Sequence, residues 1–73
     1  MNIKETVYRL IKNIVGDEIS FDDDSLLKED LGIDSFKAIN LLYELQANSI
    51  TLKSYDMDTI LTVRDLIKAL KHE

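Results

Sequence analysis

Ser35 is the residue in this 73-residue chain with the clearest capacity for chemistry. It follows Asp34 within the stretch Glu29–Phe36, which reads EDLGIDSF. A serine that acts as a catalytic nucleophile needs a base beside it, most often a histidine. The one histidine, His72, lies far from Ser35 along the chain and has no clustered partners for acid-base or metal chemistry. We therefore do not expect Ser35 to act as a catalytic nucleophile, and we do not expect the chain to be an enzyme.

The local sequence predicts that Ser35 begins a helix that runs to about Gln46. Asp34 is suited to the N-cap position, because its carboxylate can accept the unpaired amide hydrogens of the first turn. Those amides and the positive end of the helix dipole would also tolerate an anion attached to Ser35. Gly32 gives the preceding chain a conformational freedom that would help to leave the hydroxyl accessible.

No metal site is expected. The chain has no Cys, which excludes thiolate ligands and disulfides. The acidic run Asp22–Asp24 suggests calcium, but an EF-hand loop that started there would place Leu27 where glycine belongs and Leu26 at a ligand position. The run is more simply interpreted as a solvated loop that could steer basic partners weakly.

Two further segments have the spacing of amphipathic helices. The first ends at Gly16, and the last has Thr62 and Asp65 spaced like a variant capping box. Apolar residues recur every three or four positions in both, at Ile3, Val7, Leu10, Ile11 and Ile14 and at Val63, Leu66, Ile67 and Leu70.

The helix that starts at Ser35 has two apolar faces. Ala38, Leu41, Leu42 and Leu45 share one face, and Phe36, Ile39 and Tyr43 lie nearly opposite. A domain this small cannot easily surround a helix, so we expect one face to stay open to a ligand or a partner.

The remaining segments complete an all-α prediction. Residues 17–34 are expected to form a long ordered loop whose apolar side chains pack over the helices. Tyr55, Met57 and Ile60 suggest a short extra helix. We thus predict one domain over residues 1–73: a small bundle of three principal helices and a short helix, with a long loop after the first helix.

Composition agrees with this fold and excludes several functions. The chain is 45% hydrophobic and has no Pro and two Gly, which favours uninterrupted helices. A formal charge of −5 opposes binding to nucleic acid. We see no signal peptide and no membrane span, and we expect a cytoplasmic monomer.

The stretch EDLGIDSF and its flanking elements give the chain a family resemblance. The stretch resembles the D-L-G-x-D-S-[LIF] setting of the modified serine in acyl carrier and peptidyl carrier proteins. The first helix, the acidic loop, the helix at Ser35 and the TVRDLI run from Thr62 all follow in family order. The resemblance implies that a phosphopantetheinyl transferase uses coenzyme A and Mg²⁺ to attach 4'-phosphopantetheine to Ser35. The thiol of this arm would then carry acyl or aminoacyl thioesters between loading and downstream acyl-transfer enzymes.

The resemblance also implies where partners bind. Family members usually present this helix and the preceding loop, so we expect recognition through Asp34, Phe36, Lys37, Asn40 and Tyr43. Unlike carriers of primary fatty-acid synthesis, the helix is poor in acidic side chains, which favours selection by packing and a dedicated fatty-acid, polyketide, nonribosomal-peptide or aminoacyl-transfer pathway. The placement of Phe36 directly after the serine resembles the arrangement in D-alanyl carrier proteins and some other aminoacyl carriers. The alternative is a carrier-like helical interaction module without a prosthetic group.

Overall fold

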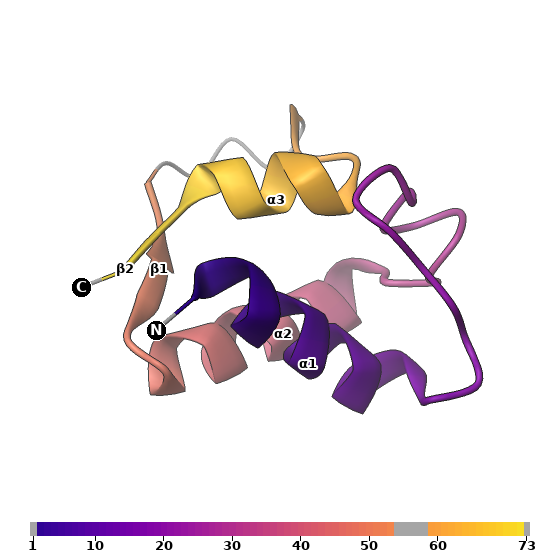
Figure 1. Cartoon of the computed structure of the whole chain (residues 1–73), viewed down its shortest axis with the longest axis horizontal. Helices are drawn as coiled ribbons and strands as arrows, with labels where there is room; N and C mark the ends of the chain where they lie inside the picture. Colours follow the sequence, from indigo (N-terminus) through magenta and orange to yellow (C-terminus); the bar gives the residue numbers. More distant parts are fainter. Residues whose placement is uncertain (1, 54–58, 73) are drawn as a thin grey trace.

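The computed structural model describes residues 2–53 and 59–72, and its elements follow the predicted order (Figure 1). Three helices are present in this part of the chain, together with a short strand pair that the sequence did not predict. The elements are α1 (Ile3–Val15), α2 (Ser35–Ala47), β1 (Ile50–Leu52), α3 (Val63–Ala69) and β2 (Leu70–His72). Figure 1 shows α1 and α2 side by side, with α3 lying across them. The prediction of a small helical bundle is confirmed.

Helix α1 is bounded by the two residues that flank it. The Asn2 side chain accepts hydrogen bonds from the backbone amides of Lys4 and Glu5, which have no acceptor inside the helix. At the other end Gly16 has a φ of 95° and donates its amide hydrogen to the Lys12 carbonyl. The prediction that Gly16 ends this helix is therefore confirmed.

The core is formed by one face of each helix and by the loop after α1. Helix α2 contributes Leu41 and Leu45, which pack against the buried stripe of α1. The buried hydrophobic residues are Val7, Leu10, Ile11, Leu27, Leu31, Ile33, Leu41, Leu45, Ile50, Val63, Leu66 and Leu70. Three of these, Leu27, Leu31 and Ile33, come from the loop. The predicted packing of the loop over the helices is confirmed.

The acidic run of the loop is tied to α1 and α3. The Tyr8 hydroxyl and the Lys4 ammonium both donate to the Asp23 carboxylate, the latter over 3.1 Å. Burial of the phenol and its hydrogen bond to Asp23 raise the pKa of Tyr8 to about 12. Arg64 donates to the Asp24 carboxylate from α3. Asp23 and Asp24 therefore attach the loop to the helices. The sequence had predicted only that this acidic run would be solvated and would steer basic partners weakly.

The prediction of a purely helical chain needs one correction. β1 and β2 pair antiparallel, with Ile50 opposite His72 and Leu52 opposite Leu70. We expected Leu70 to continue the last apolar stripe, but α3 ends at Ala69 and Leu70 has an extended backbone, with φ of −97° and ψ of 152°. In this extended segment Leu70 pairs with Leu52 and stays buried in the core. A three-residue strand has too little sequence pattern to reveal this.

The short helix expected at Tyr55 to Ile60 falls mostly on residues 54–58, which lie outside the described residues. Ile60, which follows them, is half-buried and packs against the core, as its apolar character predicts. Within the described part of the chain, no helix is long and apolar enough to cross a membrane.

Candidate functional site

Ser35 is the first residue of α2, and its side chain is exposed. Asp34 is the N-cap, as predicted: its Oδ1 accepts the Lys37 amide hydrogen over 2.9 Å, and its carbonyl accepts that of Ala38 over 2.8 Å. The amides of Ser35 and Phe36 also lie in the first turn, where the helix itself offers no acceptor. The start of α2 can therefore donate hydrogen bonds to an anion held on the Ser35 oxygen.

A turn before the helix directs Ser35 outward. Gly32 has a φ of 65°, a conformation that side chains with a Cβ rarely adopt, and nothing lies within 4 Å of the place where its Cβ would be. A larger residue at this position would therefore be opposed by backbone strain and not by lack of space. Leu31 and Ile33 on either side are buried and anchor the turn. Two side chains of this segment are therefore buried in the core, whereas the side chain of Ser35 is exposed.

Ser35 is one of the residues that line a groove of about 580 Å³. The groove runs between α2, the loop before it and the segment before α3. Its lining is mostly apolar, with charged residues among those of the loop and of the helix start. The lining residues are Leu27, Lys28, Glu29, Ile33, Asp34, Ser35, Ala38, Ile39, Leu42, Ile60 and Leu61. A group attached to Ser35 would therefore have an apolar surface within reach.

One wall of the groove is held by Asp65. Its Oδ2 accepts hydrogen bonds from the amides of Leu61 and Thr62, both over 3.1 Å, while Thr62 Oγ1 accepts the Asp65 amide hydrogen. These bonds complete the predicted capping box at the start of α3. The Leu27 amide also donates to the Leu61 carbonyl over 2.9 Å. The cap of α3 therefore also fixes the position of Leu61 beside the groove.

The Asp65 contacts predict a dependence of stability on pH. Hydrogen bonds from the amides of Thr62 and then Leu61 lower the pKa of Asp65 from 3.8. Since the folded-state pKa lies below the unfolded value, the stabilisation is present above pH 3.8 and is lost as the pH falls through the folded-state pKa. We expect the unfolding temperature of Asp65→Asn to fall less than that of wild type as the pH is lowered from about 6 to 2.

Thermal unfolding followed by circular dichroism at several pH values would measure this difference. Asp17→Asn is the matched control, because it removes a carboxylate from an exposed loop position. Parallel curves for wild type and Asp65→Asn would contradict the role given to Asp65.

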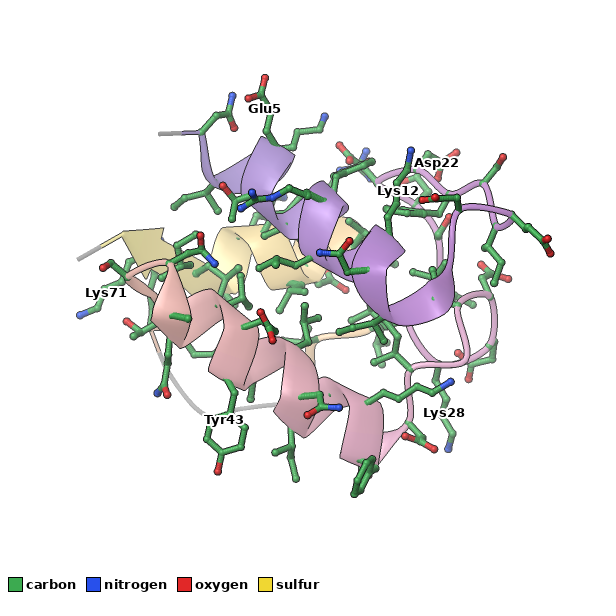
Figure 2. The ribbon with its side chains drawn as sticks, turned by 90° about the horizontal axis from the view of Figure 1, so that it is seen from below. Glu5, Lys12, Asp22, Lys28, Tyr43 and Lys71 are labelled. Atoms are coloured by element: carbon green, nitrogen blue, oxygen red, sulfur yellow. The ribbon has the colours of Figure 1, made fainter. Side chains whose placement is uncertain are left out.

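The residues predicted to recognise partners lie together around Ser35 and along α2. Asp34, Lys37 and Asn40 are exposed, and so are Phe36 and Tyr43, at 76% and 67%. Figure 2 shows Tyr43 pointing away from the body of the molecule. The second apolar face of this helix is therefore open, as its pattern predicted.

Sequence reasoning did not find the groove or the residues that complete it. Lys28, Ile60 and Leu61 come from two segments far apart along the chain, and the backbone bridge between Leu26 and Thr62 brings these segments together. The usable signal in the sequence was the adjacent apolar pair Ile60 and Leu61 just before the last helix. In the structure Leu61 is 59% exposed.

Comparison with known proteins identifies the family of the chain. Neither the curated proteins nor the solved structures include a match to the chain. A family model described as "Phosphopantetheine attachment site" matches residues 5–70, which is nearly the whole sequence. Domains of this family are non-catalytic carriers that hold 4'-phosphopantetheine covalently and work with phosphopantetheinyl transferases and acyl-transfer enzymes. The helices, the capped turn and the full-length match together show that the chain belongs to the family of phosphopantetheine-attachment carrier domains.

Proposed function

We propose that Ser35 is the residue that carries 4'-phosphopantetheine, and that the loaded protein passes acyl or aminoacyl thioesters between enzymes of a dedicated pathway. The observation that carries the proposal is the exposed Ser35 at the first position of α2, after a capped turn and among the residues that line a mostly apolar groove. Fatty-acid, polyketide, nonribosomal-peptide and aminoacyl-transfer pathways all use such carriers. The proposal includes action in the cytoplasm, as a monomer.

The chemistry divides between this chain and its partners. A transferase would bring coenzyme A with Mg²⁺, and the Ser35 oxygen would attack the β-phosphorus of the coenzyme. A new oxygen–phosphorus bond would form as 3',5'-ADP leaves, and the hydroxyl proton would pass to a base of the transferase. The chain itself presents the hydroxyl and offers first-turn amides to the phosphodiester that results.

Intact mass spectrometry tests the proposal directly. We expect the purified protein, incubated with coenzyme A, Mg²⁺ and a broad-specificity phosphopantetheinyl transferase, to gain one phosphopantetheine. Fragmentation should place the added mass on Ser35. Failure of folded protein to gain mass with several transferases would support the unmodified interaction module. A gain on another serine would contradict the assignment of Ser35.

We further propose that partners dock on the surface formed by Asp34, Phe36, Lys37, Asn40 and Tyr43, the α2 recognition surface. Its two large side chains are exposed aromatics, a residue class enriched among the residues that contribute most to binding energy. Its charges are mixed and few. These properties favour a partner with an apolar pocket over one that relies on basic side chains.

We expect Phe36→Ala to lower the kcat/KM of the transferase for the protein by about tenfold or more, the usual scale for loss of an interfacial aromatic anchor. Initial rates of loading at several protein concentrations would measure it. The control is Ile19→Ala, which removes an apolar side chain that is 37% exposed on the loop. Equal rates for Phe36→Ala and wild type would contradict the proposed surface for this partner.

A further inference from the structure

Lys28 has a distinctive position at the groove. Three of the described residues that line it are charged: Lys28 is a cation, and Glu29 and Asp34 are carboxylates. Figure 2 shows Lys28 on the loop next to the start of α2. The ion pairs within the described residues join Lys4 to Asp23 and Arg64 to Asp24, so the exposed ammonium group of Lys28 belongs to neither.

Loading of Ser35 would change the charge balance at this place. The phosphodiester adds a negative charge to a groove that already has two carboxylates and one ammonium group. Asp34 cannot turn away, because its carboxylate accepts the Lys37 amide hydrogen and caps α2. The first-turn amides of α2 can donate to the added charge, and a nearby cation would further offset its repulsion by the two carboxylates. A lysine ammonium on its flexible stem is a common phosphate partner.

Lys37 is closer to Ser35 along the chain but is less suited to this role. Lys37 follows Ser35 by two positions, which corresponds to a rotation of about 200° around α2 and places the two side chains on nearly opposite sides of the helix. Lys37 also does not line the groove, whereas Lys28 and Ser35 line it together.

We propose that Lys28 pairs with the phosphodiester of the arm on Ser35 and holds the first part of the arm along the groove. The inference rests on the proposed attachment at Ser35. In this proposal Lys28 contacts the phosphodiester and thereby positions the arm. A partner enzyme that draws the arm into its own active site must break this pair.

The test compares unloaded and loaded protein for three variants: Lys28→Gln, Lys28→Arg and Lys37→Gln. We expect loading to lower the unfolding temperature of Lys28→Gln by about 2–4 °C more than that of wild type, the scale of one exposed ion pair in a domain of this size. In Lys28→Arg, loading should change the unfolding temperature by the same amount as in wild type. Lys37→Gln removes the same charge from α2. In this variant, too, loading should change the unfolding temperature as it does in wild type. High salt should abolish the difference between variants.

A second readout separates the contact from general stability. In wild type, loading should shift the nuclear magnetic resonance signals of the Lys28 side chain, and the phosphorus signal of the arm should differ between wild type and Lys28→Gln. Mass spectrometry first shows whether Ser35 is loaded, so failure of the proposed function appears there. Loaded protein with unchanged Lys28 signals, or an equal change in Lys28→Gln and Lys37→Gln, overturns the role of Lys28 alone.

Discussion

Ser35→Ala is expected to abolish loading completely while leaving the protein folded. Loss is complete because the arm is joined through the serine oxygen, which alanine lacks. The fold should tolerate the change, because the side chain is exposed at the first position of α2 and the capping contact belongs to Asp34. Surface substitutions away from such contacts usually change the free energy of unfolding by less than about 0.5 kcal/mol.

Intact mass after treatment with the transferase measures the first effect, and urea denaturation measures the second. Ser20→Ala is the matched control, since it removes the hydroxyl of an exposed serine in the loop. It should gain one phosphopantetheine as wild type does. A loaded, folded Ser35→Ala protein would contradict the assignment of Ser35.

Leu45→Ala should have the largest effect on stability. Leu45 is fully buried in α2, where this helix packs against α1. Truncation of a buried leucine leaves a cavity and costs about 2–5 kcal/mol. A domain of this length has a total free energy of unfolding of roughly 4–11 kcal/mol, so the variant should lose a large share of its stability.

Urea denaturation at 25 °C would measure the loss as a lower midpoint with an unchanged slope. Tyr43→Ala provides the control on the same helix, because Tyr43 is 67% exposed and should change stability by less than about 0.5 kcal/mol. Similar midpoints for the two variants would show that the two faces of α2 do not differ as described.

The end of α1 and the starts of α2 and α3 could be predicted because they depend on short-range chemistry. Asp34, Gly16 and the Thr62–Asp65 box act on amides and carbonyls within four residues of themselves. The same applies to Ser35, whose position at the helix start follows from its neighbours. The two-faced pattern of α2 also predicted that one of its apolar faces would stay open, although not which one.

The strand pair and the groove could not be predicted, because both depend on residues that are distant along the chain. Ile50 pairs with His72, and a run of three residues shows no alternation that separates a strand from a loop. Lys28 and Leu61 become neighbours of the same groove only after the loop bonds to the segment before α3. The role of Asp23 as acceptor for Tyr8 and Lys4 likewise depends on how the loop folds back.

The strand pair also fixes one end of α3. β2 follows α3 directly and is bonded to β1, so the C-terminal end of α3 is fixed to the chain that leaves α2. Figure 1 shows this junction at one end of the molecule, with the N-terminal ends of α2 and α3 toward the other. At that other end the amides of Val63 and Arg64 donate to the carbonyls of two loop residues, Ser25 and Asp23. Both ends of α3 are therefore anchored, and the segment before α3 that lines the groove is attached to the loop that precedes Ser35.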